Sequence, residues 1–209
     1  MTWCGRTQLI NRLHVLLVKL IPSGVARGLS AESAAQALRG VRPRDTLRRT
    51  LRALAVDLVA ELRRRDRRIA ETTQALSDAV TASGTTLTGL PGIGDVVATK
   101  ILARTGTISR FPSASAFASF CGAAPIEVSS GDVVRHRLSR AGDRQLNYAL
   151  HVMALAQIRY DNPGQAYYQR KRAAGKSHKE AMRCLKRRLA DVVYRTMIND
   201  SVSSLSAAA

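Results

Sequence analysis

The stretch RDTLRRTLRALAVDLVAELRRRDRRIAETTQALSDAVTAS, from Arg44 to Ser83, contains neither glycine nor proline and decides the fold class. Leucines recur along its first half at spacings of four, three and four residues: Leu47, Leu51, Leu54 and Leu58. This period is that of one face of an α-helix, for which Asp45 is a suitable N-cap and Gly84 a suitable stop. Because such a helix is long for a globular protein, we expect it to pair with another helix in a coiled coil or bundle.

Two shorter helices are expected before this segment. Apolar residues from Leu9 to Leu20 follow a helical period, and the segment from Pro22 to Gly24 ends that helix. A second helix follows Ser30 and stops at Gly40. Between Arg63 and Arg68 the long helix carries five arginines, which allow two interpretations: a solvated face or a contact with nucleic acid.

The chain changes character after about residue 85, where glycine, serine and proline become frequent and the expected elements become short. Helices are predicted from Ser113 to Gly122, from Arg144 to Tyr160 after an Asp143 cap, from Gln165 to Ala174, and from Ser177 onward. The residues Pro125–Val128 and Val133–Leu138 can form two short extended segments.

These elements predict a mostly α protein in three parts. Residues 1–84 form a helical coiled-coil or linker region, and residues 85–200 form a helical domain with one short β-hairpin. Residues 201–209 end in three alanines and are expected to be a disordered tail. No stretch has the length and apolar character of a transmembrane helix, and no export signal is visible, so we expect a cytoplasmic protein.

The composition indicates a polyanionic partner. The chain has 33 Lys and Arg residues against 15 Asp and Glu residues, which gives a formal net charge of +18. Such an excess favours association with nucleic acid, and we expect the protein to be found at the nucleoid. Three cysteines, Cys4, Cys121 and Cys184, are too widely separated for a disulfide framework or a zinc site, so no metal site is expected within this chain.

The sharpest local signal is the sequence LTGLPGIGD from Leu87 to Asp95, which precedes an apolar helical stretch that contains Lys100. It resembles the hairpin of a helix-hairpin-helix motif. Gly92 and Gly94 would let the backbone approach a phosphate, and the free amides at the start of the next helix would bind that phosphate. Lys100 would add a positive charge. The competing interpretation is a tight turn between packed helices, without a ligand.

A second candidate site lies at Ser129-Ser130-Gly131, where a serine beside glycine would be exposed in a loop. A serine nucleophile that attacks a phosphodiester needs cations to offset the charge that develops in the transition state. Three downstream arginines are candidates for this clamp: Arg137, Arg140 and Arg144. From the residues alone, a simple turn remains the competing interpretation.

Several stretches together resemble a known family. They are RTxxINRLH from Arg6 to His14, LTGLPGIG from Leu87 to Gly94, FCGAAP from Phe120 to Pro125, the pair Ser130-Gly131, and LSRAGDxxL from Leu138 to Leu146. Their order and spacing are similar to the C-terminal portion of bacterial insertion-sequence transposases of the one-hundred-ten type, which are relatives of pilin-gene invertases. One departure is Asp143, where the family usually has asparagine, but both residue types cap a helix.

The resemblance implies DNA recombination by transesterification, with Ser130 as the nucleophile and Ser129 as the fallback. It also implies three kinds of partner: DNA, a structured guide RNA, and further copies of the chain that associate through the long helix. Full-length members of the family carry a RuvC-like nuclease domain with acidic metal ligands. Magnesium is therefore expected only with that domain, and the present chain is expected to be truncated and to hold no cofactor of its own.

The leading hypothesis is a DNA-binding transposase fragment with a serine recombinase site, whose activity in isolation needs a direct test. The chief alternative is a non-catalytic helix-hairpin-helix module that grips the DNA backbone and dimerises through its long helix. A third interpretation is an RNA-binding protein that uses the same positive charge.

Overall fold

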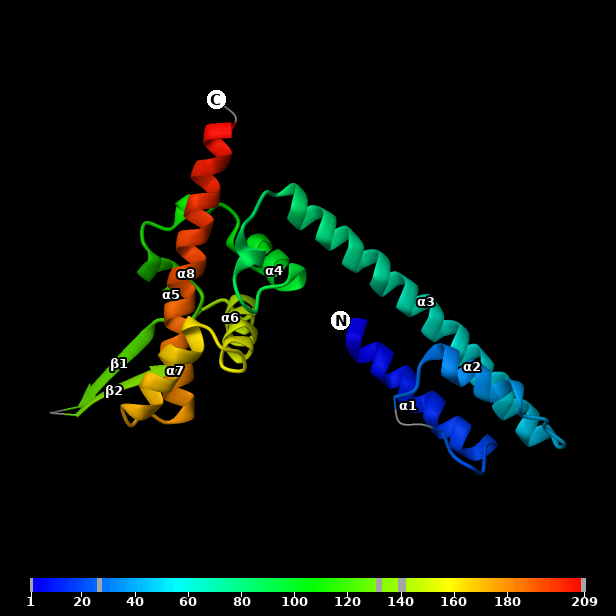
Figure 1. Cartoon of the computed structure of the whole chain (residues 1–209). Helices are drawn as coiled ribbons and strands as arrows, with labels where there is room; N and C mark the ends of the chain where they lie inside the picture. Colours follow the sequence, from blue (N-terminus) through cyan, green and yellow to red (C-terminus); the bar gives the residue numbers. More distant parts are fainter. Residues whose placement is uncertain (1, 26–27, 131–132, 139–141, 208–209) are drawn as a thin grey trace. The chain divides into compact units, whose positions relative to one another are not determined.

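Figure 1 shows the computed structural model of the protein, which describes residues 2–25, 28–130, 133–138 and 142–207. Side chains are described throughout these ranges except at 2–4, 126–130, 133–138, 204–205 and 207. The chain divides into two compact units, Met1–Ala75 and Leu76–Ala209. The described residues are mostly α-helical, as the sequence predicts. None of the described helices combines the length and the apolar character that crossing a lipid bilayer requires.

The first unit is built from α1 (Thr2–Leu20), α2 (Ala31–Arg39) and the first part of α3 (Thr46–Ala82). Buried leucines from all three helices form its core: Leu13, Leu17, Leu38 and Leu62. The helix α1 begins before Leu9, where its apolar period starts. An ion pair fixes these early turns, because the Arg6 Nε donates to Asp66 Oδ1 on α3 at 2.6 Å.

Polar caps start α2 and α3 where the sequence predicts them. The Ser30 hydroxyl accepts from the Ser33 amide at 3.0 Å, and the Ser33 hydroxyl accepts from the Ser30 amide at 2.9 Å. Asp45 Oδ1 accepts from the Arg48 amide at 2.7 Å. Each cap satisfies an amide that the first turn of a helix leaves without an intrahelical partner.

The helix α3 is the long helix predicted between Arg44 and Ser83. Ala55, Val59 and Leu62 are buried in the core that α3 shares with α1 and α2. Leu47 and Leu54 remain 69% and 49% exposed. The chain's own helices therefore cover part of the predicted pairing face, and coiled-coil pairing through the exposed leucines remains a prediction.

The second unit is assembled around α8, which packs against α5, α6 and α7 (Figure 1). After the end of α3, its elements are η1 (Leu87–Gly89), α4 (Asp95–Thr105), η2 (Ile108–Arg110), α5 (Ala114–Phe120), β1 (Pro125–Ser130), β2 (Val133–Leu138), α6 (Arg144–Gln157), α7 (Pro163–Ala173) and α8 (His178–Ala207). Large apolar side chains fill its core: Leu87, Ile101, Phe117, Leu146, Leu150, Met153, Leu185 and Val193.

Several helices of this unit begin at polar caps. The Ser113 hydroxyl accepts from the Ala116 amide at 3.2 Å, as the sequence predicts for α5. The helix α7 begins at Pro163, two residues earlier than expected, because Asn162 caps it and proline is well suited to a first turn. The helix α6 ends at Gln157, slightly before the predicted Tyr160.

The expectation of a disordered tail from Ser201 onward is wrong for the residues up to Ala207, which continue α8. No glycine or proline interrupts this stretch. A tertiary contact also holds the helix just before it, since the Asp200 carboxylate accepts from Thr85 Oγ1 at 2.8 Å and from the Thr86 amide at 3.0 Å. This anchor joins residues that are far apart in the sequence, so no local pattern could have indicated it.

Candidate nucleic-acid interface and serine hairpin

The serine pair lies on a two-stranded antiparallel hairpin. In its register Ser129 pairs with Val134 and Ser130 with Val133, so Ser130 is the last residue of β1, next to the turn. The turn residues 131 and 132 and residues 139–141, which include the predicted clamp residue Arg140, lie outside the described residues. The hairpin therefore carries its serines at the end farthest from the helices.

The register also separates Arg137 from the serines. Arg137 pairs with Ile126, near the base of the hairpin, and lies four residues along β2 from Val133. Because an antiparallel strand rises about 3.4 Å per residue, its backbone is about 14 Å along the strand from the position opposite Ser130. The third candidate arginine, Arg144, is exposed at the first position of α6.

The two chain segments that enter and leave the hairpin touch each other at glycines. A Cβ atom added to Gly142 would collide with the backbone nitrogen and Cα of Gly122, and would lie 2.9 Å from the carbonyl carbon of Cys121. The Asp143 amide donates to the Phe120 carbonyl oxygen at 2.7 Å, directly beside this contact. The base of the hairpin is therefore held by backbone contact that a larger residue at position 142 would prevent.

Asn147 of α6 ties this base to α8. Its Nδ2 donates to the Cys121 and Gly122 carbonyl oxygens at 3.0 and 2.9 Å. Its Oδ1 accepts from the Lys186 Nζ at 2.5 Å. Lys186 is only 8% exposed, and this burial lowers the pKa of its ammonium group. One half-buried amide thus connects α8 to the turn that leads into β1.

Asp143 fixes the start of α6, the helix that follows the hairpin. Its Oδ1 accepts from the Gln145 and Leu146 amides, both at 2.9 Å, which makes it the predicted cap of α6. Its Oδ2 accepts from the Arg104 Nε at 2.8 Å, on α4. Burial alone would raise the pKa of this carboxyl, but the bonds from Arg104 and from the two amides outweigh burial and lower the pKa.

The glycine-rich turn before α4 has two different glycines. Gly92 has a φ of +89°, and a Cβ there would lie 2.8 Å from the Ala156 Cβ and 2.9 Å from the Met153 oxygen, so packing against α6 requires glycine. Gly94, the N-cap of α4, has open space around it and makes no side-chain cap. The first turn of α4 also carries Asp95, whose negative charge opposes an anion at that end.

Two cations, Lys100 and Arg104, lie on the face of α4 that packs against α6. Lys100 Nζ lies 4.8 Å from the centroid of the Tyr148 ring, and Arg104 bonds to Asp143 one turn further along. Both contacts are made to α6, near the base of the hairpin. The structure thus brings Lys100 from the glycine-rich motif and Arg144 from the serine cluster to one helix pair.

The sequence alone did not indicate that Asn147 and Lys186 support the hairpin. Lys186 belongs to a basic triplet, Lys186-Arg187-Arg188, whose local sequence indicates only positive charge. Inside the fold its members separate: Lys186 is buried, and Arg187 pairs with Asp191. Only the packing of α8 against α6 distinguishes them, and no sequence signal does.

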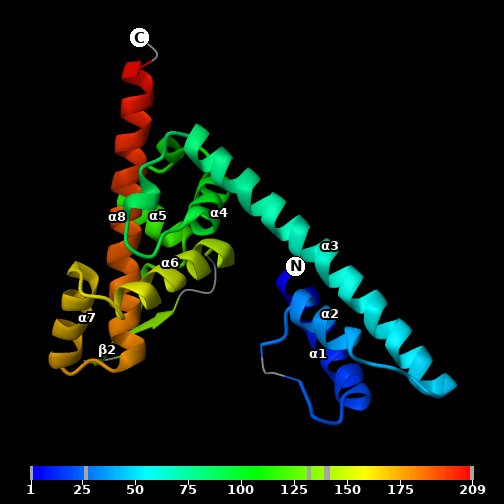
Figure 2. The same ribbon diagram turned by 45° about the vertical axis from the view of Figure 1, so that its right-hand side comes forward.

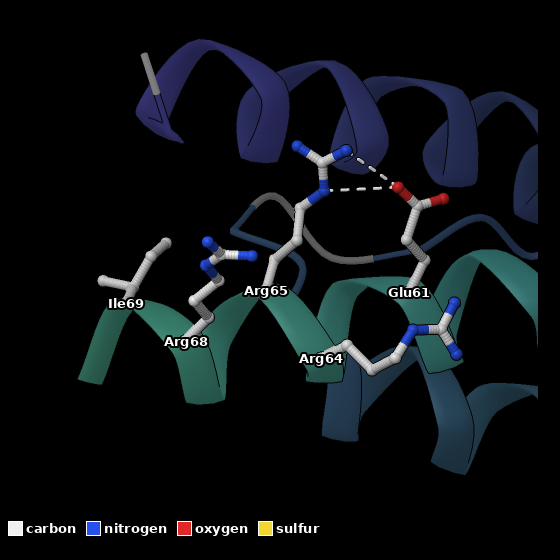
Figure 3. Close-up of a pocket in the computed structure, with 5 residues that line it drawn as sticks. All are labelled: Glu61, Arg64, Arg65, Arg68 and Ile69. Carbon is white, nitrogen blue, oxygen red and sulfur yellow. Dashed lines mark hydrogen bonds and ion pairs between the residues drawn. The ribbon is translucent and has the colours of Figure 1, made fainter. Parts of the chain in front are cut away.

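A hollow on the first unit collects arginines of α3 (Figure 3). It has a volume of about 530 Å³ and is lined by Glu61, Arg64, Arg65, Arg68 and Ile69. Figure 3 shows Arg65 and Glu61 turned toward each other, with Glu61 Oε1 accepting from Arg65 at 2.9 and 3.2 Å. Part of the positive charge around this hollow is therefore already balanced by Glu61.

Among the described residues, no group of three or more His, Cys, Asp or Glu side chains could hold a metal ion. That magnesium belongs to a RuvC-like domain, as the family resemblance implies, stays a prediction.

The glycine-rich turn, the helices α4 to α6 and the serine hairpin all lie within one stretch that is similar to a known family. Residues 84–169 match the sequence profile described as the transposase IS116/IS110/IS902 family. This match confirms the resemblance expected from the sequence.

Relatives of the chain are insertion-element proteins of Streptomyces and Mycobacterium species. An insertion element IS110 protein of Streptomyces coelicolor is 36% identical over 115 residues, which cover 54% of this chain and 28% of that protein. An insertion element IS900 protein of Mycobacterium paratuberculosis is 35% identical over 115 residues, covering 54% and 29%. An insertion element IS116 protein of Streptomyces clavuligerus is 28% identical over 151 residues, covering 70% and 37%. The matched region thus spans well under half of each relative.

Proposed function

We propose that this protein is a DNA recombinase in which the hydroxyl of Ser130 attacks a DNA phosphodiester, with Ser129 as the alternative nucleophile. One observation carries the proposal: Ser130 ends a strand at the tip of a hairpin whose base is fixed by contacts from α4, α5, α6 and α8. A fixed base restrains the backbone of the hairpin, which lowers the entropic cost of reaching a reactive geometry. The transposase match over residues 84–169 supports DNA as the substrate.

The proposed step exchanges one phosphodiester for another. The Ser130 Oγ loses its proton to solvent and bonds to phosphorus, while the bond from phosphorus to one sugar oxygen breaks. That oxygen leaves as a hydroxyl after it takes up a proton. The strand end stays attached to the protein through serine until the hydroxyl of a second strand end reverses the step.

Cations near the hairpin base would hold the DNA backbone during this exchange. Lys100 and Arg144 on the α4–α6 pair are the described candidates, and neither forms an ion pair with a carboxylate within the described residues. Arg137 and Arg140 remain candidates from the sequence. Gly94 at the open start of α4 is a further phosphate contact, whereas Gly92 has a packing role that explains it without a ligand.

Association of several copies and a structured guide RNA belong to the same proposal. The exposed Leu47 and Leu54 on α3 support association of copies through the long helix. The net charge of +18 supports binding of an RNA as well as of DNA. A protein with these properties would act in the cytoplasm, at the nucleoid.

The test is a search for a protein–DNA adduct. The full chain is incubated with a pool of short, random-sequence duplexes labelled on both strands, and the products are separated under denaturing conditions. We expect a labelled band at higher mass, which Ser130→Ala abolishes and which the exposed control Ser109→Ala leaves unchanged. In tryptic digests the nucleotide should be attached to the peptide that spans residues 111–135. An adduct that survives in both Ser130→Ala and Ser129→Ala would contradict the proposed site.

The alternative function is a helix-hairpin-helix module that binds the DNA backbone without chemistry. The observation that favours it is the open start of α4 at Gly94, with Lys100 on the same helix. The two functions differ in one measurement. Tight, salt-dependent binding without any denaturation-resistant adduct would support the module and contradict the recombinase.

A further inference from the structure

Three positively charged side chains lie around one half-buried aromatic ring on α7. The ring is that of Tyr167, which packs against the core of the second unit. The Arg170 Cζ lies 5.8 Å from its centroid, the Lys171 Nζ 5.4 Å, and the Arg188 Cζ of α8 5.5 Å. These four residues are named here the Tyr167 cluster.

The charges of the Tyr167 cluster are not balanced by carboxylates within the described part of the chain. The nearby acids of α8 have other partners: Glu180 accepts from the amide and hydroxyl of Ser177, and Asp191 pairs with Arg187. No ion pair joins Arg170, Lys171 or Arg188 to an acid among the described residues. The cluster is therefore a local excess of three positive charges.

Arg188 is the member of the Lys186–Arg188 triplet that belongs to the Tyr167 cluster, because the fold gives the other two members different partners. Lys186 turns inward to Asn147, and Arg187 is held by Asp191 and by the Ser115 hydroxyl, which accepts at 3.2 Å. Arg188 is the exposed member, and it is the one that joins Tyr167. Two basic runs that are separate in the sequence thus meet at one ring.

Three like charges around one ring repel one another, and each cation–π contact offsets only about 0.5–1 kcal/mol at an exposed site. A bound anion relieves this repulsion. Guanidinium groups bind phosphate through paired hydrogen bonds, while the lysine adds a point charge. A chain of phosphodiesters supplies several such anions at close spacing, so its fit to three cations exceeds that of a single carboxylate.

We propose that the Tyr167 cluster is a binding site for the phosphodiester backbone of a nucleic acid, separate from the serine hairpin. The inference rests on the proposed function insofar as it takes a nucleic acid as the partner. The two sites lie toward the same end of the second unit, because α7 and the hairpin are both near the beginning of α8 (Figures 1 and 2). A strand held by the cluster would thereby be kept at the end of the unit that carries the hairpin.

The test compares two triple variants that lose the same charge. In the first, Arg170, Lys171 and Arg188 are changed to Gln. In the control, the exposed residues Lys19, Arg44 and Arg49 of the first unit are changed to Gln. Affinity for a random-sequence DNA duplex and for an RNA hairpin is measured over a range of salt concentrations, after circular dichroism has shown that both variants keep their helices.

We expect the cluster variant to bind duplex DNA at least about tenfold more weakly, with a log–log salt slope shallower by about two to three units, since each phosphate contact contributes about 0.9. The control should retain most of the wild-type slope. A larger effect on the DNA duplex would assign the site to the substrate, and a larger effect on the RNA hairpin would assign it to a structured RNA. Both outcomes support the site.

Variants of the ring provide a second, independent measurement. Tyr167→Phe keeps the ring and should bind as the wild type does, whereas Tyr167→Leu keeps apolar contact with the core but releases the cations, and should bind several-fold more weakly. If the cluster variant and the control lose equal affinity and slope, the site is overturned while the serine chemistry stands. If the wild type binds neither nucleic acid, both proposals are overturned.

Discussion

The two units of the protein treat their positive charges differently. In the first unit arginines meet carboxylates: Arg6 pairs with Asp66, Arg63 with Glu32, and Arg65 with Glu61. In the second unit Arg104 and Arg187 also meet carboxylates, but six other cation contacts are made to aromatic rings: Lys100 on Tyr148, Arg110 on Phe111 and Phe120, and three cations on Tyr167. A carboxylate cancels the charge of its partner, whereas a ring holds a cation in place and leaves its charge intact. The second unit is therefore the better equipped to bind a polyanion, although the arginine run of α3 is denser in the sequence.

The largest expected effect concerns the hairpin base, a backbone contact in the second unit. Gly142→Ala places a methyl group against the backbone of Gly122 and should lower the free energy of unfolding of this unit by about 3 kcal/mol. Gly94→Ala is the matched control, because Gly94 has open space and an ordinary φ of −95°. Denaturant unfolding measures both, and equal midpoints for the two variants would show that the contact does not matter.

The second largest effect concerns the hydrogen bond between Asn147 and the buried Lys186. Asn147→Leu leaves the Lys186 ammonium and two carbonyl oxygens without their hydrogen-bond partner, and should cost about 2–3 kcal/mol. Adding Lys186→Met removes the stranded charge and should recover about 1 kcal/mol or more of that loss. A double-mutant cycle by urea unfolding measures the coupling. Simple additivity of the two changes would mean that the two side chains do not depend on each other.

The second unit also contains an ion pair, between Arg104 and Asp143, and the pH dependence of its contribution to stability tests the comparison between the units. Arg104 meets a carboxylate, Asp143, whose pKa lies below its ordinary value in the folded state. The stability from this shift is present above the unfolded pKa of about 3.9 and is lost as the pH falls through the folded pKa. Arg104→Gln removes a cation but keeps the burial, so acid unfolding should begin at a higher pH, with a loss of about 1 kcal/mol at neutral pH. An unchanged acid transition, followed by circular dichroism, would contradict this.

The smallest effect belongs to the ion pairs of the first unit. The Arg6 and Asp66 side chains are partly exposed, so their coupling in a cycle of Arg6→Gln and Asp66→Asn should be about 0.5 kcal/mol. Neither change should alter the salt slope for DNA binding by the amount expected for the Tyr167 cluster. A slope change as large as that of the cluster variant would erase the proposed difference between the units.

Local signals predicted much of this fold. The absence of glycine and proline between Arg44 and Ser83 predicted α3, and Ser30, Asp45 and Asp143 cap helices where the sequence indicated. These features depend on a few neighbouring residues, which is why a single sequence reveals them. The serine hairpin was visible for the same reason, through a turn between two short β-prone segments.

Long-range packing explains what the sequence did not reveal. Lys186 and Arg188 look alike along the chain, but α6 covers one and leaves the other exposed. Gly142 is visible as a glycine, whereas its contact with Gly122 depends on how the hairpin closes. The bonds from Asp200 to Thr85 and Thr86 stabilise a helix whose last turns look like a tail. Each of these features depends on a neighbour that is distant in the sequence.

The contact between Gly122 and Gly142 has a consequence for how such proteins can diversify. The chain leaves the helices at Gly122 and returns to them at Gly142. Because these two glycines touch, the segment between them is a separate insertion in the helical domain. Its length and sequence can change in evolution, or be exchanged by a protein engineer, while the helical scaffold keeps its shape. Relatives with different hairpins would then share one scaffold.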